Sequence, residues 1–466
     1  MIKSKLAAVA AVLLLGGCAT FSPDGGFAGI EQAAKERLGK AVQWDRDRSA
    51  DGSETARART AELLARPLSA DDAVQIALLN NRGLQAAFSE LGIAEAEVVR
   101  AGRLPNPGFS FGRLTRGDEV ELERGLHFNL ARLIAMPWLS EIESRRFERV
   151  QREATLQMLR LAADTRKAWV MAVAAGETVR YMHQVQQSAE AGAELARRMA
   201  QAGNWNRLNQ AREQSFYADA ALNLARAQRA RDSARERLTR LMGLWGEQIA
   251  FKLPERLPDL PPSARDLPAI EQTAMQQRLD VQAAKLDAEQ TAKNLGLTQA
   301  TRFINVLELG VVHNSSNEAP TQRGWELSFE LPLFDWGMAR EKKAEAIYMQ
   351  ALNRAAETAV NARSEVREAY LASRNSYDVA RHYRDEIVPL KKRISEENLL
   401  RYNGMLIGVF ELLADARAQI AGVNGYIEAL RDYWLAQSDL DMALVGKPAL
   451  SAVTAASVSS SAAAAH

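Results

Sequence analysis

Apolar and small residues recur along residues 140–203 in steps that alternate between four and three. These positions are Ala154, Met158, Leu161, Thr165, Ala168, Ala172, Ala175, Val179 and Met182. A seven-residue rhythm is typical of a supercoiled helix, and roughly sixty residues at about 1.5 Å each form a rod about 90 Å long. Because alanine is the commonest residue of the seam, at four of these nine positions, the pattern predicts that neighbouring helices approach closely.

The period shortens to two ahead of this helix. Phe109 and Phe111 alternate with small residues, and a second run after a turn near Gly117 alternates largely with glutamates. The apolar members of the second run are Val120, Leu122, Leu126, Phe128 and Leu130. This alternation predicts a hairpin of two strands with one apolar and one polar face. We expect Met136-Pro137-Trp138 to close the hairpin and the long helix to begin there.

The same order of elements returns in the second half of the chain. Residues 278–284 correspond to residues 81–87, and a second hairpin follows them. In its last strand Trp325, Leu327, Phe329 and Leu331 alternate with Glu326, Ser328 and Glu330. A long helix from Met338 to about Arg401 and a return helix from Val409 to about Leu444 then repeat the first half. The chain is therefore predicted to be a tandem duplication of helix, hairpin, very long helix, turn and long helix.

Composition excludes several classes of protein. The 466 residues carry a formal charge of +1, which lacks the basic excess of nucleic-acid-binding proteins. With 25% charged residues and a mean hydropathy of −0.25, the chain is not a polytopic helical membrane protein. A single cysteine, Cys18, excludes an intrachain disulfide.

The N-terminus has the features of a secretory signal. Two lysines precede an apolar run from Leu6 to Leu15, which is too short to span a bilayer. The run ends in Leu15-Gly16-Gly17-Cys18, which resembles the bacterial lipoprotein signal, in which the cysteine is lipidated and becomes the mature N-terminus. Ala19 follows rather than aspartate, and in such lipoproteins this implies delivery to the outer membrane. The alternative is a chance cysteine after a plain signal peptide.

These patterns divide the chain into six segments. They are a signal peptide at 1–17, a lipidated segment at 18–67, a first repeat at 68–243, a proline-rich linker at 244–266, a second repeat at 267–445 and a disordered tail at 446–466. Ser69 is predicted to cap the first helix of the first repeat, with Asp72 at the third helical position. Residues 80–83 are expected to perturb that helix.

The hairpins allow two environments, because an isolated amphipathic hairpin is marginal in water. They can pack on a soluble core or enter a bilayer, where only a closed barrel leaves no strand edge unpaired. In a barrel Trp325, Leu327, Phe329 and Leu331 face lipid, and the polar residues between them face a water-filled lumen. Four strands cannot close a barrel, so the membrane hypothesis requires an oligomer whose number of chains the pattern leaves open.

Three segments resemble one known family. They are Leu104-Pro105-Asn106-Pro107, Leu331-Pro332-Leu333-Phe334-Asp335-Trp336-Gly337, and the stretch from Arg401 through Asp415. Together with the duplication, they resemble the TolC-like outer-membrane efflux factors, and Cys18 resembles the lipoprotein branch of that family. The resemblance covers roughly residues 68–445.

The resemblance implies a fold and a set of partners. The fold is mainly α with a small β part: a homotrimer whose long α-helical barrel continues into a 12-stranded transmembrane β-barrel, with four strands per chain. The partners implied are a periplasmic adaptor, or membrane fusion protein, an inner-membrane pump and outer-membrane lipid. The location implied is the bacterial outer membrane, with a lipid anchor and an extension into the periplasm.

A candidate gate lies near the second helical turn. Glu411 and Asp415 are one helical turn apart, and in a closed tunnel they would recur as acidic rings that favour cations. In the family, aspartates near this turn line the periplasmic aperture, and Asp415 is the better positional match. Arg401 is expected to pair with either residue. The alternative is a solvated pair on an exposed helix face.

Nothing in the sequence indicates an enzyme or a cofactor. The five histidines are scattered without metal-ligand spacing, and no nucleotide-binding glycine motif follows a strand. Two functions remain: the passive outer-membrane duct of a tripartite efflux or type I secretion system, and a lipid-anchored periplasmic coiled-coil scaffold or adaptor without a pore. The transported substrate cannot be inferred from these patterns.

Overall fold

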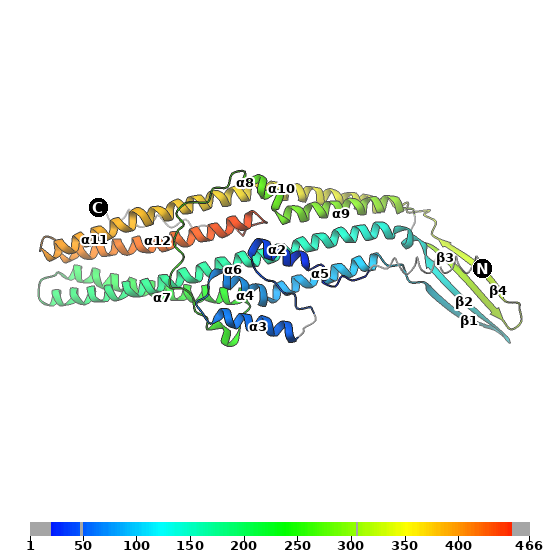
Figure 1. Cartoon of the computed structure of the whole chain (residues 1–466), viewed down its shortest axis with the longest axis horizontal. Coiled ribbons are helices and arrows are strands. Elements are labelled where there is room, and N and C mark those ends of the chain that lie inside the picture. The colour runs from blue at the N-terminus through cyan, green and yellow to red at the C-terminus, as the bar shows by residue number, and fades with distance from the viewer. Residues whose placement is uncertain (1–19, 47–49, 304–305, 450–466) are drawn as a thin grey trace. The chain divides into compact units, whose positions relative to one another are not determined.

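The computed structural model describes residues 20–46, 50–303 and 306–449, and Figure 1 shows the course of the chain. The signal peptide, Cys18 and all but the first four residues of the predicted tail lie outside the described residues. Packing divides the chain into two compact units. The first contains residues 1–33, 86–155 and 279–360, and the second contains residues 34–85, 156–278 and 361–466. Each unit therefore draws segments from both repeats.

The first unit holds one antiparallel sheet with the strand order β1-β2-β3-β4. The strands are β1 (Gly108–Arg116), β2 (Glu119–Asn129), β3 (Leu307–Ser316) and β4 (Gln322–Phe329). Both predicted hairpins are confirmed. Strand β2 pairs with β3, with Leu126 opposite Val311, so the two hairpins form one continuous four-stranded surface (Figure 1).

Long helices lead into and out of this sheet. They are α5 (Arg82–Ala101), α6 (Leu130–Gln201), α9 (Leu279–Thr301) and α10 (Met338–His382). In the first unit the beginning of α6 lies beside α9, where Lys293 and Glu141 pair at 2.9 Å and Arg149 and Asp287 at 3.6 Å. Such partly exposed pairs contribute at most about 1 kcal/mol each, so they orient the two helices more than they hold them together.

The start of α6 differs from the prediction. The helix begins at Leu130 and contains Pro137, whereas we expected the helix to begin only after the Met136-Pro137-Trp138 segment. The side chain of Asn129 accepts a 2.7 Å hydrogen bond from the Arg132 backbone N–H, so a cap is present directly after β2. The missing N–H of Pro137 removes one helical hydrogen bond, and the surrounding leucine, alanine and arginine residues favour the helix strongly enough to continue through it.

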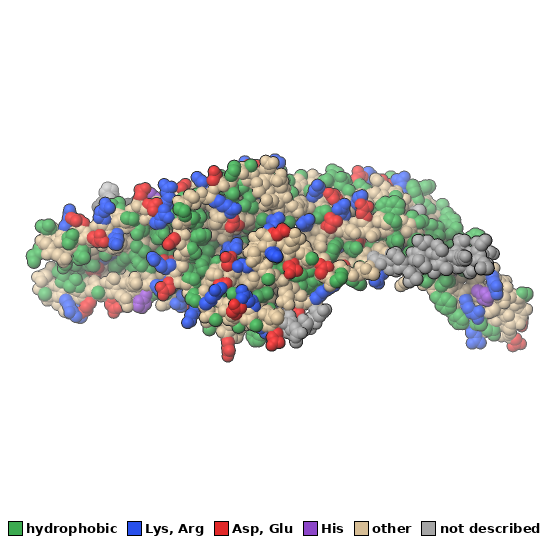
Figure 2. All heavy atoms as spheres, viewed as in Figure 1, with side chains coloured by type: hydrophobic (Ala, Val, Ile, Leu, Met, Phe, Trp, Pro, Cys, Tyr) green, Lys and Arg blue, Asp and Glu red, His purple; other side chains and the backbone are tan. Residues whose placement is uncertain are grey.

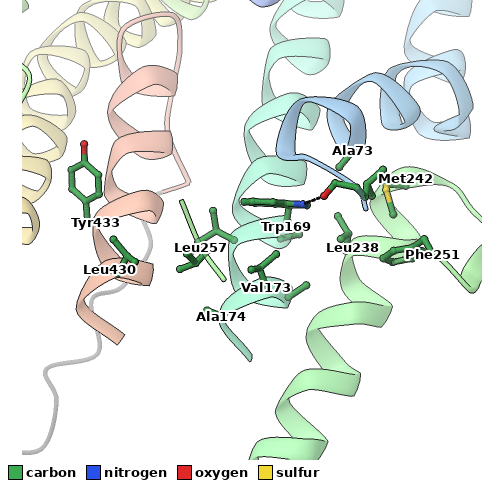
Figure 3. Packing of buried hydrophobic residues seen from close by; sticks show 14 of the residues in the cluster. Ala73, Trp169, Val173, Ala174, Leu238, Met242, Phe251, Leu257, Leu430 and Tyr433 are labelled. Atoms are coloured by element: carbon green, nitrogen blue, oxygen red, sulfur yellow. Dashed lines mark hydrogen bonds between the residues drawn. The ribbon is translucent and has the colours of Figure 1, made fainter. Parts of the chain in front are cut away.

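The second unit has the larger hydrophobic core (Figure 3). Its helices include α4 (Ala70–Asn80), α7 (Arg207–Met242) and α12 (Val409–Ala443). At its centre Trp169 of α6 is 4% exposed and donates a 2.7 Å hydrogen bond from Nε1 to the Leu68 carbonyl. The proline-rich linker belongs to this core, because Leu257 and Leu260 are buried in it.

The two repeats break their entry helices at equivalent positions. Asn81 separates α4 from α5, and its Nδ2 donates to the Leu241 carbonyl at the end of α7. Arg278 separates α8 (Ile270–Gln277) from α9. Its Nη1 donates a 3.5 Å hydrogen bond to the Ala443 carbonyl at the end of α12. In both repeats the break therefore lies against the C-terminal end of the return helix. The expected perturbation at residues 80–83 is confirmed, and so is the capping box of Ser69 and Asp72.

The second long helix is interrupted. Between α10 and α11 (Val388–Asn403) a π-helical turn covers Tyr383–Ile387. The Tyr383 ring lies over Gly425 of α12, where a Cβ would approach its Cε1 to 2.7 Å. Only glycine permits this close contact, so the π turn and Gly425 fit each other.

Two short helices lie near the N-terminus. They are α2 (Ala28–Leu38) and α3 (Ala50–Leu64), and both fall in the segment at residues 18–67 that precedes the first repeat. Leu63 of α3 is buried in the core of the second unit, so tertiary packing stabilises a helix whose own pattern is weak. No described helix combines an apolar stretch of membrane-spanning length with few charges.

Candidate functional site

The strand register places most of the apolar residues of both hairpins on one face of the sheet, whereas Leu114 and Val312 lie on the other. Phe109, Leu126, Val311 and Trp325 lie opposite one another in a row across all four strands. The next row toward the helices contains Phe128, Leu309 and Leu327, and Leu307 and Phe329 follow. Directly opposed residues of antiparallel strands share a face. We call this surface the apolar face.

The apolar face is uncovered in the single chain. Trp325 is 75% exposed and Phe109 is 70% exposed. Figure 2 shows hydrophobic side chains gathered where the strands meet the helices, whereas acidic and basic side chains intermingle over the helices. Exposed apolar area on this scale is typical of an interface with lipid or with another chain.

The opposite face of the sheet is polar and acidic. All five glutamates of the strands lie on it: Glu119, Glu121, Glu123, Glu308 and Glu326. His127 also lies on this face, and its Nε2 is 2.9 Å from Ser110 Oγ. Of the predicted residues, Trp325, Leu327 and Phe329 are on the apolar face and Glu326 and Ser328 on the polar face. Leu331 and Glu330 follow the last residue of β4.

The sheet is also open at both sides. Strands β1 and β4 are its two outer strands, so each has one edge without a partner strand among the residues that the structure describes. An open edge beside an exposed apolar face promotes association with further strands. The arrangement is therefore suited to an assembly in which β1 of one copy pairs with β4 of the next.

The predicted gate residues surround the turn between α11 and α12. Glu411 is exposed in the first turn of α12, and Asp415 is partly exposed one turn later. Arg401 Nε lies 3.4 Å from Glu397 Oε1, so its ion pair is formed within α11. The expected pairing of Arg401 with Glu411 or Asp415 is not seen, because the partner one turn away on the same helix is nearer.

A buried ion pair near this region was not anticipated from the sequence. Glu213 of α7 is 1% exposed, and its Oε1 lies 2.6 Å from an Nη of Arg417 on α12. The Arg417 guanidinium also lies over the Phe216 ring, 4.3 Å from its centroid. This Glu213–Arg417 pair connects one helical hairpin to the other within the second unit. The available signal was the position of Glu213 seven residues before Ala220, which is buried on the same helix.

Apolar residues surround the pair. Val185, Ala189 and Ala220 form a small buried cluster, and Tyr181, Phe216 and Ile420 pack against it. Burial raises the pKa of Tyr181 to about 12, and its hydroxyl lies 3.4 Å from the Ile420 carbonyl. The contact between α6, α7 and α12 is thus largely apolar, with one charged pair inside it.

No metal site is indicated in the described ranges, where no three His, Cys, Asp or Glu side chains gather in a suitable cluster. The comparisons with known proteins point to a channel instead. The family model for outer membrane efflux proteins matches residues 270–395. No curated protein sequence matches the chain.

Solved structures match most of the chain. The Campylobacter jejuni CmeC outer membrane channel is 18% identical, with a TM-score of 0.70 over 80% of this chain and 85% of that one. The Neisseria gonorrhoeae MtrE outer membrane channel in its open state is 20% identical, with a TM-score of 0.66 over 80% and 88%. The outer membrane protein VceC from Vibrio cholerae is 15% identical, with a TM-score of 0.68 over 81% and 96%.

These findings confirm the resemblance predicted from the sequence. Residues 270–395 match the outer membrane efflux protein model, and the chain has the fold of these outer membrane channels. The mainly α fold with four strands per chain is confirmed as well.

Proposed function

We propose that this chain is the outer-membrane channel of a tripartite efflux or type I secretion system, and that it works as a passive duct rather than an enzyme. The observation that carries the proposal is the four-stranded sheet with one apolar face, one acidic face and two open edges. Such a sheet is unstable alone in water. In a closed barrel, lipid covers the apolar face, water in the lumen hydrates the acidic face, and closure pairs the edge strands.

The width of a duct sets a lower limit on the number of chains. Two copies supply eight strands, and side chains fill the interior of a barrel of that size. Three copies supply twelve, which agrees with the trimer that the family resemblance implies. The acidic face then lines the lumen, and Trp325, Leu327, Phe329 and Leu331 face lipid. A periplasmic adaptor and an inner-membrane pump complete the proposed system.

Disulfide cross-linking of the full-length protein tests the closed ring. Arg116→Cys on β1 and Gln322→Cys on β4 place thiols on the two open edges and on the same polar face of the sheet, and the only native cysteine is Cys18. We expect oxidation to give species up to a trimer and none larger. The matched control joins neighbouring strands of one chain, with Leu122→Cys opposite Ser315→Cys, and stays monomeric. A monomeric edge variant, combined with no conductance in planar bilayers, would favour the scaffold without a pore.

The proposed anchor is tested separately. Cys18 lies at the end of the lipoprotein-like signal, and we expect Cys18→Ala to abolish palmitate labelling and weaken retention in the outer membrane. The barrel still inserts in part, so conductance persists. Equal labelling of the variant and the wild type would remove the lipid anchor from the proposal and leave the channel intact.

A further inference from the structure

The strands separate their charges by face. Besides the five glutamates on the polar face, they carry four arginines, at positions 113, 116, 124 and 323. Arg124 and Arg323 lie in one row with Phe111 and His313, on the apolar face. Arg113 opposes Leu122 on the same face, and Arg116 alone lies with the glutamates, opposite Glu119. We call Arg113, Arg124 and Arg323 the basic row.

The basic row is compact and free to bind an anion. Neighbouring strands are about 5 Å apart, so Arg124 and Arg323 are about 10 Å apart, and Arg113 is diagonal to Arg124 at about 7 Å. Arg113 and Arg323 are exposed and Arg124 is half-buried. Along the described parts of the chain, none of the three forms an ion pair, and every strand glutamate is on the other face.

The position of the row along the strands defines its environment. It lies beside the row of Trp325 on the side of the hairpin turns, and Arg323 is the second residue of β4. A lipid-facing arginine is strongly destabilising at the bilayer midplane and nearly neutral near an interface. Three of them on one surface therefore belong at the level of the headgroups. The strand ends opposite the hairpin turns join the helices, which the proposed function places in the periplasm. The basic row therefore lies at the level of the outer leaflet.

We propose that the basic row binds the phosphate groups of outer-leaflet glycolipids, an inference that rests on the proposed function. Arginine forms forked, charge-assisted hydrogen bonds with phosphate, and its aliphatic stem lies along apolar surface while the guanidinium reaches the headgroup. The Trp325 row directly below contacts the acyl chains of the same lipid. In a trimer the row recurs three times and fixes the depth of the barrel in the membrane.

The test uses the full-length protein in detergent, titrated with bisphosphorylated lipid A, dephosphorylated lipid A or inorganic phosphate while thermal unfolding is followed. We expect bisphosphorylated lipid A to stabilise the wild type most. Each arginine near an anionic surface contributes about fivefold in affinity, so Arg113→Gln, Arg124→Gln and Arg323→Gln together weaken binding about 100-fold. The matched control, Arg116→Gln, changes one arginine of β1 on the opposite face and leaves binding unchanged.

Two results overturn the inference: equal stabilisation by the two forms of lipid A, or equal binding by the triple variant. Stabilisation by inorganic phosphate at the same affinity also overturns it, because it shows a free-anion site. If the triple variant does not assemble, the comparison of lipids on the wild type decides the matter. Conductance of the wild type in planar bilayers tests the channel function separately from the lipid site. A channel that conducts but shows no phosphate-dependent lipid binding would refute the lipid site and leave the channel function standing.

Discussion

The sheet of the first unit and the helical core of the second place apolar residues in opposite ways. In the sheet Trp325 and Phe109 are exposed, and the glutamates lie together on the other face. In the helices of the second unit Trp169 and Leu238 are buried, and the charged Glu213 is buried against Arg417, which is itself partly exposed. The same chain thus contains one region that excludes water by itself and another whose apolar face stays uncovered in the single chain.

The difference changes what a charge does in each region. In the helical core neither water nor a nearby counter-ion stabilises an unpaired charge. In the proposed barrel, the cost of a charge on the apolar face of the sheet depends on its depth in the bilayer, and a charge on the polar face stays hydrated. Four predictions test this difference between the two regions.

The largest effect is expected at the buried pair. Arg417→Ala leaves the Glu213 carboxylate buried without its cation, and removing one partner of a buried pair costs about 3–5 kcal/mol. Urea unfolding of the purified protein, followed by helical circular dichroism, should show this loss for the second unit. The double variant Glu213→Leu with Arg417→Met should regain most of it. If Arg417→Ala alone is as stable as the wild type, the pair does not hold α7 to α12.

The next effect concerns the sheet. Phe329→Arg puts a charge on the apolar face and should cost about 2–4 kcal/mol if the residue lies near the bilayer midplane. The measure is the fraction of protein that assembles as a heat-resistant trimer in membranes. Glu326→Arg is the matched control on the polar face of the same strand, and it should assemble normally and alter conductance. Glu330→Arg, just beyond the strand, should behave like the control. Equal assembly of the Phe329 and Glu326 variants would show that the faces are assigned wrongly.

A smaller effect is expected at the candidate gate. Exposed charges do not hold the fold, so Glu411→Gln with Asp415→Asn should assemble normally, reduce cation selectivity and weaken divalent-cation block in planar bilayers. Arg401 pairs with Glu397 in an exposed i,i+4 arrangement worth about 0.3–0.5 kcal/mol, so Arg401→Ala should increase leak only slightly. An unchanged reversal potential and block in the double variant would mean that the two carboxylates are a solvated surface pair.

The smallest effect depends on pH. Burial raises the pKa of Tyr181 from 10.0 to about 12, so the folded state holds the phenolic proton more tightly than the unfolded state. The contribution is complete below pH 10 and is lost as the pH rises from 10 to 12. Urea midpoints at pH 9 and pH 11 should therefore differ more for the wild type than for Tyr181→Phe. Identical differences for the two proteins would show that Tyr181 does not contribute.

Much of the fold follows from local patterns. The alternation in β1, β2 and β4 predicted which residues share a face, because side chains of a strand point alternately to its two sides. The capping box of Ser69 and Asp72 and the break near residues 80–83 depend only on neighbouring residues and were also predictable. The start of α6 was not, since Pro137 is a strong local signal against a helix that the cap at Asn129 and the surrounding residues outweigh.

Contacts between distant segments were decided by the tertiary structure alone. The alternation does not state that β2 pairs with β3, so neither the four-stranded surface nor the basic row could be assembled from the sequence. The Glu213–Arg417 pair depends on the rotation of α7 against α12, and a heptad pattern gives an inward position without its partner. Periodicity is a property of one segment and reports which side of that segment avoids water. Register and helix rotation are properties of two segments, and they are set only when both are packed together.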